Sequence, residues 1–376
     1  MSQLLQRGAR RPFDWVLFGV VLVLATIGIL SLYSASNSDG SSHYARQILW
    51  FLLGGVGAGI IALQDYRVIA RLAYPMLIIG IILLLLVTVA GTSINGSKRW
   101  LALGGFSVQP SELLKLAVVV VTARYFSDHE RPEGRGIVDL LVPVGMISIP
   151  FIQILTQPDL GTSLTLWLIF GTMAAFDRLK PTLTLSLIMV VIISIPLMWG
   201  FVLKEYQKDR VRAFMDPEAE LQGDAWQVRQ SRIAIGSGGA VGKGWLQGTQ
   251  VQGGFVPYDE SDFIFTHTGE QFGFVGSTVL MGLYIALLLW ALQIARNARD
   301  RFGVLCAVGI AALYFWHITI NIAMNMGMLP VVGLWLPFLS HGGTSVLVCM
   351  FAAGILMSIS MRRTPTATAM PRNWLG

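Results

Sequence analysis

Two ionisable residues interrupt an otherwise apolar stretch of the chain. Glu112 and Lys115 belong to the segment Gln-Pro-Ser-Glu-Leu-Leu-Lys, which starts at Gln109. Their spacing places both side chains on one face of a helix, and the proline and the glutamate suit its first turn. Charged groups inside an apolar helix are costly and commonly functional. We expect the pair to line an outward-open cavity, although an ion pair that fastens two helices has the same spacing.

A short basic and aromatic segment precedes this helix. Lys98, Arg99 and Trp100 follow Asn-Gly-Ser. Cations at this point suit a phosphate-bearing lipid head group, because ammonium and guanidinium groups pair with phosphate oxygens. An interfacial anchor with an aromatic belt residue is the alternative.

A polar turn, Gln-Pro-Asp-Leu-Gly-Thr, separates two apolar stretches at residues 157–162. Proline and glycine predict a tight hairpin there. Gln157 and Asp159 are candidate substrate contacts, and Asp159 is also suited to cap the following helix.

Asp262 stands between a polar turn and the apolar run Phe-Ile-Phe at 263–265. A carboxylate at such a boundary is partly desolvated, which moves its pKa upward and favours use as a general base. The sequence leaves a loop cap open as well, because Asp259 and Glu260 are equally acidic.

The composition predicts which elements carry these residues. Of the 376 residues, 54% are hydrophobic and 13% charged, whereas soluble domains carry about 25% charged residues. A membrane-spanning helix needs about 20 apolar residues. We therefore predict one domain over residues 1–376, an all-α polytopic membrane protein with about ten transmembrane helices. The predicted spans are 13–32, 47–63, 72–90, 110–126, 138–156, 160–176, 182–203, 270–294, 303–327 and 341–361.

The distribution of basic residues predicts the orientation. Most of the 27 lysines and arginines fall in segments that share the side of the N-terminus, which is the pattern of cytoplasmic loops. We expect both termini in the cytoplasm and the candidate residues above on the opposite face. The net charge of +6 then reflects topology and gives no reason to expect nucleic-acid binding.

Two longer segments between predicted spans complete the candidate site. The segment 204–269 is a large extracytoplasmic loop, for which we predict short amphipathic helices along the membrane surface. It contains Gln230 and a glycine run at 236–244 that fails the nucleotide-binding Walker A pattern twice. The segment 329–345 carries two prolines and several glycines, which predicts a re-entrant or tightly folded hairpin buried in protein. His341 lies in it as a structural histidine, and nothing has metal-ligand spacing.

Together these segments resemble the SEDS family (shape, elongation, division and sporulation). The resemblance runs from Phe-Asp-Trp-Val at residue 13, through Tyr-Ser-Ala-Ser at 33, to the last span. Leu-Pro-Val-Val-Gly at 329 is more similar to the RodA branch than to the FtsW branch. The resemblance implies a peptidoglycan glycosyltransferase that polymerises lipid II, a disaccharide-pentapeptide on undecaprenyl diphosphate, during cell elongation. A division-specific FtsW-like polymerase, a flippase for lipid-linked precursors and a non-catalytic scaffold are the alternatives.

The resemblance also implies roles for residues. The family's essential acid falls on Asp262, its first outer-loop arginine on Arg46, and its Arg-Trp pair on Arg99 and Trp100. The candidate substrate contacts are Arg46, Lys98, Arg99, Trp100, Gln109, Glu112, Lys115, Gln157, Asp159, Gln230, Glu270 and Ser340. The sequence departs from the family pattern at Glu260-Ser261 for His-Thr, Glu270-Gln271 for Glu-Glu, and Ser340-His341 for Ser-Tyr.

The implied surroundings are the bacterial cytoplasmic membrane and its cell-wall machinery. Expected partners are a class B penicillin-binding protein, which would crosslink the strands, and elongation-complex membrane proteins. No cofactor is firmly predicted, although a divalent cation, magnesium or manganese, would help to neutralise a diphosphate.

Overall fold

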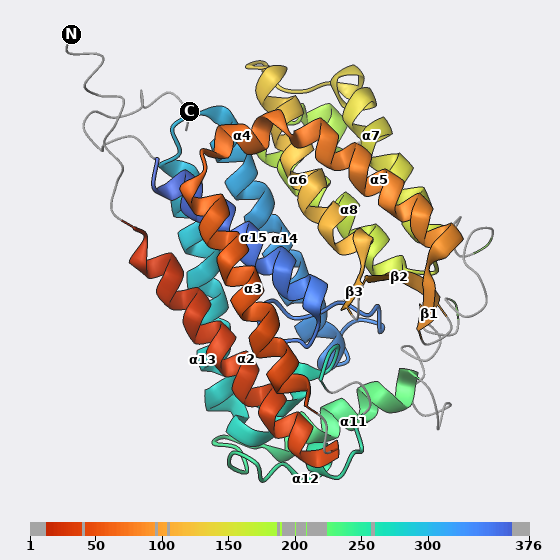
Figure 1. Cartoon of the computed structure of the whole chain (residues 1–376), viewed down its shortest axis with the longest axis vertical. Coiled ribbons are helices and arrows are strands. Elements are labelled where there is room, and N and C mark those ends of the chain that lie inside the picture. The colour runs from red at the N-terminus through yellow and green to blue at the C-terminus, as the bar shows by residue number, and fades with distance from the viewer. Residues whose placement is uncertain are drawn as a thin grey trace.

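The computed structural model describes residues 13–39, 42–94, 97–103, 106–185, 224–256 and 260–362, together with 189, 200 and 208. These residues form a helical bundle with a small antiparallel sheet at one side (Figure 1). The elements are α2 (Trp15–Asp39), α3 (His43–Leu63), α4 (Tyr66–Arg71), α5 (Ala73–Ala90), β1 (Thr92–Ile94), β2 (Ser97–Leu103), β3 (Phe106–Val108), α6 (Pro110–Asp128), α7 (Ile137–Thr156), α8 (Leu160–Phe176), α11 (Asp224–Ser237), α12 (Thr249–Gln252), α13 (Ile264–Arg296), α14 (Arg301–Asn325) and α15 (Gly343–Ser360).

The all-α polytopic prediction is confirmed. In the described part of the chain, seven helices are long and apolar enough to cross a membrane, namely α2, α3, α5, α7, α13, α14 and α15. Helix α8 is a shorter apolar helix, and α6 carries the buried charges Glu112 and Lys115. These nine helices match nine predicted spans. The tenth, 182–203, lies mostly outside the described residues.

Two local features differ from the sequence predictions. The span predicted from residue 270 begins at Ile264, because the polar residues His267 and Glu270 are buried against neighbouring elements and not exposed to solvent. The second feature is the sheet β1-β2-β3, where only helices were predicted. In its first hairpin Ile94 pairs with Ser97, and the sequence between them, Asn-Gly, is a strong hairpin signal.

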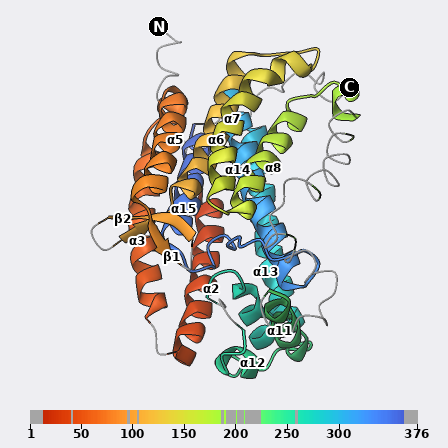
Figure 2. The ribbon, with the colours of Figure 1, turned by 90° about the vertical axis from the view of Figure 1, so that its right-hand side faces the viewer.

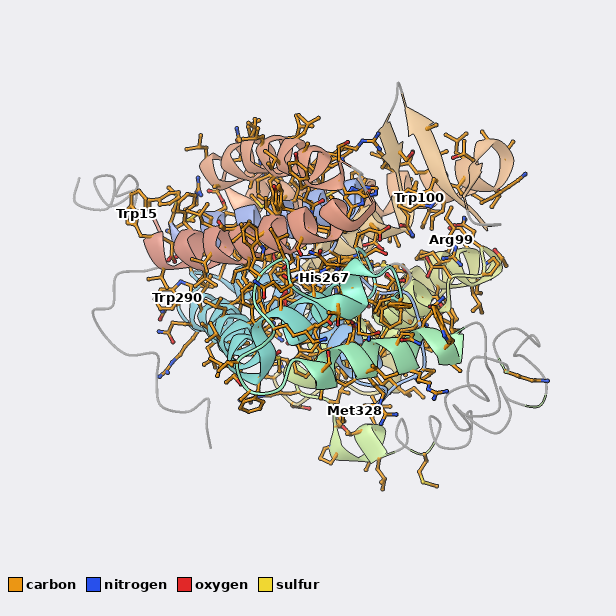
Figure 3. All side chains as sticks on the ribbon, turned by 90° about the horizontal axis from the view of Figure 1, so that it is seen from below. Trp15, Arg99, Trp100, His267, Trp290 and Met328 are labelled. Carbon is orange, nitrogen blue, oxygen red and sulfur yellow. The ribbon has the colours of Figure 1, made fainter. Side chains whose placement is uncertain are left out.

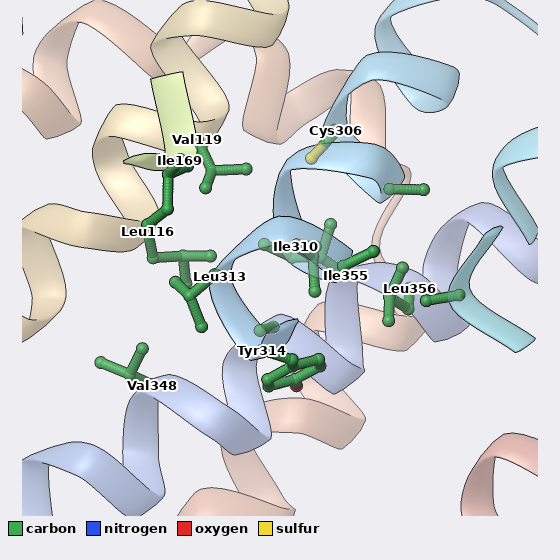
Figure 4. Packing of buried hydrophobic residues seen from close by; sticks show 14 of the residues in the cluster. Leu116, Val119, Ile169, Cys306, Ile310, Leu313, Tyr314, Val348, Ile355 and Leu356 are labelled. Atoms are coloured by element: carbon green, nitrogen blue, oxygen red, sulfur yellow. The ribbon is translucent and has the colours of Figure 1, made fainter. Parts of the chain in front are cut away.

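Helix α14 forms the centre of the bundle, with α6, α8, α13 and α15 packed around it. Its buried face includes Cys306, Ile310, Leu313 and Tyr314, which interlock with residues of α6, α8 and α15 (Figure 4). A helix that is apolar on all sides is typical of the interior of a membrane bundle. The central position of α14 means that any polar residue on it must find a partner inside the protein.

Helices α3 and α15 approach each other closely through a glycine. The α-carbon of Gly354 lies against the backbone of Ala58, so that an added Cβ would stand 2.7 Å from the Ala58 carbonyl oxygen. Small residues permit such contacts, and in lipid close packing drives helix association.

The two ends of the described chain lie at the same end of the bundle. Asp14, just before α2, accepts hydrogen bonds from Trp290 Nε1 of α13 at 3.0 Å and from the hydroxyl of Ser360 at the end of α15. Helices α11 and α12 lie at the opposite end, and the sheet lies to the side (Figures 1 and 2). The layer around α11 and α12 is therefore remote from both ends of the described chain.

The α3–α15 contact predicts the effect of one methyl group. Gly354→Ala should lower the unfolding temperature in detergent, since overpacking costs about 1–3 kcal/mol. Gly59→Ala is the control, because nothing lies within 4 Å of a Cβ there. Equal unfolding temperatures for the two variants would contradict this account of the contact.

Candidate active site

Asp262 lies in a turn immediately before α13, whose N-cap residue is Phe263. The residue is half-buried. Its backbone carbonyl accepts two hydrogen bonds, from the side-chain amides of Asn321 and Asn325, each at 2.9 Å. Gly333 lies on the other side, with φ of 69°, and a Cβ there would be 3.5 Å from Oδ2 of Asp262. The turn is thus held between α14 and the segment that follows it.

The segment at residues 327–342, here named the re-entrant segment, has no helix or strand and is largely buried. The segment therefore has the irregular and mostly buried backbone that its prolines and glycines predict, while its position relative to a membrane stays a prediction. Its polar groups bind protein: Ser340 Oγ accepts from the amide of Leu336 at 2.7 Å and donates to the carbonyl of Ser261 at 2.6 Å. Gln47 Nε2 donates to the Ser340 carbonyl at 2.9 Å. Irregular backbone at membrane depth requires such internal partners.

Glu112 and Lys115 form a buried ion pair, with 2.8 Å between Oε1 and Nζ, and the lysine side chain is 0% exposed. Trp335 of the re-entrant segment donates from Nε1 to Glu112 Oε2 at 2.6 Å. The ammonium also lies 3.0 Å from Nε2 of His317 and 5.1 Å from the Trp335 ring centre. The pair therefore joins α6, α14 and the re-entrant segment.

These contacts determine the tautomer of His317. The Lys115 ammonium has only donors to offer, so Nε2 of His317 accepts and the proton sits on Nδ1. Nδ1 faces the Trp335 carbonyl at 3.3 Å, and the two rings stack at 3.9 Å. The result is a closed ring of hydrogen bonds in which every buried polar group has a partner.

A second polar cluster gathers at the start of α8. Asp159 Oδ1 accepts from the Thr162 amide at 3.1 Å, which is the helix-capping role considered from the sequence. Its Oδ2 lies 3.3 Å from Gln109 Nε2 and 3.8 Å from Arg99. Arg99 also donates to the Gln157 carbonyl at 2.9 Å.

This cluster adjoins the re-entrant segment, because Gly161 packs directly against the Val332 carbonyl. Seen from below, Arg99 and Trp100 of β2 lie towards one side of the molecule, while His267, in the first turns of α13, lies near the middle (Figure 3). The structure therefore brings Arg99, Gln109, Gln157 and Asp159 together, on one flank of the segment that holds Asp262.

Glu270 is fully buried, and its carboxylate binds residues of the layer around α11 and α12. It accepts from Lys243 Nζ at 2.6 Å and from the amides of Gln250 and Val251 at 2.8 and 3.0 Å. These amides belong to the first turn of α12, whose N-cap residue is Gly248 and has no capping side chain. Glu270 therefore caps α12 from another helix, and every described contact of its carboxylate is internal.

The remaining candidates lie further outside. Arg46 is exposed in the first turn of α3, and Lys98 is exposed on β2. Trp100 is partly buried on the same strand, and Gln230 is partly buried on α11. Helix α11 packs on α13 and α14, with Ser231 and Ala234 buried.

The sequence analysis missed three polar residues of α14. His317, Asn321 and Asn325 recur at intervals of four, and each is 0% exposed. Three polar side chains at helical spacing in an apolar stretch are themselves a signal of a functional or coupling face. That signal was present in the sequence.

His341, at the end of the re-entrant segment, meets the His43 ring edge-on, with 4.6 Å between ring centres. Burial, with smaller contributions from His43 and the charge of Arg46, lowers the pKa of His341 from 6.5 to about 4. The folded protein therefore holds this imidazole neutral.

Comparison with known proteins places the chain in a family. The model of a cell cycle protein family that groups FtsW, RodA and SpoVE matches residues 14–365. The chain belongs to this family. The resemblance to the SEDS family inferred from its motifs is confirmed.

Named relatives cover nearly the whole chain. The peptidoglycan glycosyltransferase MrdB of Escherichia coli K12 is 37% identical over 344 residues, 92% of each chain. The probable peptidoglycan glycosyltransferase FtsW of Trichlorobacter lovleyi is 36% identical over 368 residues, 93% of this chain and 95% of that protein.

Solved structures share the fold. A chain from a peptidoglycan synthase complex, described as coordinating polymerization and crosslinking, matches with a TM-score of 0.81 and 26% identity, covering 94% of this chain and 99% of that one. The crystal structure of RodA from Thermus thermophilus matches with a TM-score of 0.68 and 24% identity, covering 93% and 97%.

The described residues were also tested for a cation site. Among them, no three or more His, Cys, Asp or Glu side chains gather as metal ligands would. The divalent cation considered from the sequence stays a prediction.

The ion pair of α6 predicts an order of stabilities. Lys115→Met should cost about 3–5 kcal/mol, because it leaves the Glu112 carboxylate buried without its cation. The double variant Glu112→Gln/Lys115→Met should recover much of that loss. Unfolding temperatures in detergent test this order, and a double variant less stable than the single one would contradict it.

The neutral state of His341 predicts a pH effect. The unfolded chain takes up a proton near pH 6.5 and the folded chain only near pH 4, so stability falls as the pH drops through this window. His341→Asn should reduce the drop in unfolding temperature between pH 7.5 and pH 4.5. A drop as large as that of the wild type would exclude His341 as its source.

Proposed function

We propose that this chain is a peptidoglycan glycosyltransferase that polymerises lipid II into glycan strands. Family membership and the names of its relatives support the activity. The observation that carries the site is Asp262: a half-buried carboxylate in a turn whose backbone is fixed by two fully buried amides. A fixed, partly desolvated carboxylate suits a general base.

In the proposed reaction Asp262 takes the proton from the 4-hydroxyl of the acceptor sugar. The hydroxyl oxygen then forms a bond to the anomeric carbon of the second lipid-linked chain. The bond from that carbon to the diphosphate oxygen breaks, and the lipid diphosphate leaves with the electron pair. The proton stays on the carboxylate until it passes to solvent.

The leaving diphosphate needs positive charge nearby, because charge develops on it in the transition state. Arg99 supports this role, since it lies on the flank of the re-entrant segment and its side chain is 27% exposed. Arg46 and Lys98 are exposed cations for the lipid-linked head groups. The remaining buried candidates, Glu112 and Lys115, are proposed to support the site from inside.

The proposed location is the bacterial cytoplasmic membrane, with both termini in the cytoplasm and Asp262 on the periplasmic face. The apolar helices and the family support an integral membrane protein. The basic residues cluster on the side of the termini, and the Asp14–Ser360 contact supports termini on one side.

The proposed partner is a class B penicillin-binding protein that crosslinks the new strands. The similar chain from a peptidoglycan synthase complex supports this pairing. We propose cell elongation as the setting, with elongation-complex membrane proteins nearby, from the Leu-Pro-Val-Val-Gly segment. Relatives named MrdB and FtsW are almost equally similar, so an FtsW-like division role is the alternative.

The function is tested by neutralising one carboxylate. Asp262→Asn should lower glycan polymerisation from labelled lipid II at least about 100-fold, the scale of general-base catalysis, while the purified protein stays folded. Asp128→Asn removes the same charge from the end of α6 and should keep wild-type activity.

The alternatives give different results in the same experiment. A flippase would form no glycan in any variant and would move lipid II across vesicle bilayers with or without Asp262. A scaffold would neither polymerise nor move lipid II. Polymerisation by Asp262→Asn at the wild-type rate would refute the proposed role of the carboxylate.

A further inference from the structure

Both side-chain amides on one face of α14 converge on a single carbonyl. Asn321 and Asn325 each donate to the Asp262 carbonyl oxygen at 2.9 Å. We infer that Asn321 and Asn325 are positioning residues that set the orientation of the Asp262 carboxylate for proton transfer. The inference rests on the proposed function, and it assigns a role to residues that do not contact the substrate.

The geometry around the carbonyl leaves it little freedom. A carbonyl oxygen has two lone pairs, and the two amides supply one donor for each. Both asparagines are 0% exposed, so water does not compete for these bonds. Because the carbonyl belongs to the same residue as the carboxylate, fixing it restricts the directions in which the side chain can point.

The amides are themselves held in one orientation. Thr266 donates its hydroxyl to Asn325 Oδ1 at 3.0 Å, which turns the NH₂ group of Asn325 towards Asp262. The second hydrogen of that NH₂ faces the Asn321 carbonyl at 2.8 Å. Ser231 of α11 lies 2.7 Å from the Thr266 hydroxyl. A flipped Asn325 amide would set its oxygen against the Asp262 and Asn321 carbonyls and would lose both bonds that its NH₂ group donates to them.

Asn321 also binds the part of the re-entrant segment that lies near the Asp262 carboxylate. Its second amide hydrogen binds the Leu334 carbonyl at 2.6 Å, the residue directly after Gly333. Gly333 lies close to the carboxylate, since a Cβ added there would stand 3.5 Å from Oδ2 of Asp262. One side chain therefore fixes both the Asp262 turn and the part of the re-entrant segment that lies over it.

The same face of α14 connects this turn to the buried ion pair. His317 lies one turn before Asn321 and binds Lys115, while Trp335, next to Leu334, binds Glu112. Contacts thus run without a gap from the ion pair, through the re-entrant segment, to Asp262. The positioning role gives a function to the three buried polar residues, His317, Asn321 and Asn325, of the otherwise apolar helix α14.

The test is kinetic. Asn321→Leu and Asn325→Leu keep the branching of the side chain at Cγ, with a larger volume, but remove the donors. Each should lower kcat for lipid II polymerisation about 10- to 100-fold, the scale expected when a reacting group shifts by about 1 Å, with KM within about twofold. Tyr314→Phe is the matched control, since it removes another buried bond from α14 to a carbonyl, at Cys349, far from the reacting group. It should leave kcat within about twofold.

A merely structural role makes a different prediction. Loss of stability alone would reduce the amount of active enzyme, so kcat per folded molecule, determined by active-fraction titration, would match the wild type. That result in folded leucine variants overturns the inference and leaves the proposed function intact. If Asn321→Leu or Asn325→Leu fails to fold, Asn321→Ser or Asn325→Ser, whose hydroxyl is too short to reach the carbonyl, gives the same comparison.

The control distinguishes a failure of the positioning role from a failure of the proposed function. A loss of kcat in Tyr314→Phe equal to that of the asparagine variants overturns the positioning role. Wild-type protein that makes no glycan, or full polymerisation by Asp262→Asn, overturns the proposed function first and the inference with it.

Discussion

A charge pair enclosed by apolar helices is stable only when every donor and acceptor on it is used. Glu112 and Lys115 meet this requirement with groups from another helix and from a segment without regular structure. The segment in turn is tolerated at this depth because those charges, and the asparagines of α14, satisfy its backbone and side chains. Each part makes the burial of the other possible, and Asp262 lies where they meet.

The fold could be predicted from sequence largely because apolar runs near 20 residues have few alternatives. Helix α13 was predicted to start too late, because His267 and Glu270 are typical of a loop until their buried partners are known. The sheet was missed although Asn-Gly marks its first hairpin. A search for membrane spans gives little weight to short strands, so this signal was passed over.

The individual residues of the candidate site could be predicted from the sequence, but the way in which they come together in space could not. Arg99, Gln109, Gln157 and Asp159 come from three separate stretches, and only the packing of β2 and α8 brings them together. Glu270 illustrates the opposite case. A lone acid near a predicted span resembles a substrate contact, whereas it caps a helix through amides 19 and 20 residues earlier in the chain. Chain order gives no sign of such a pairing.

The backbone of Gly273, with φ of 64° and ψ of −156°, divides α13 into a short arm and a long one. The short arm is bonded to the layer around α12 through Glu270 and to the Asp262 turn at its start, while the long arm faces lipid at several exposed apolar residues. Gly273 packs against the loop at 239–242, and the first amides of the long arm, those of Phe274 and Val275, donate to the carbonyls of Gly239 and Ala240 at 2.9 and 3.0 Å. Further along the long arm, the hydroxyl of Tyr284 donates to the Pro337 carbonyl of the re-entrant segment at 2.7 Å. The kink therefore changes the direction of α13 while both arms stay joined to the elements around the carboxylate, so that a tilt of the long arm to match the thickness of its bilayer would act on the same segment.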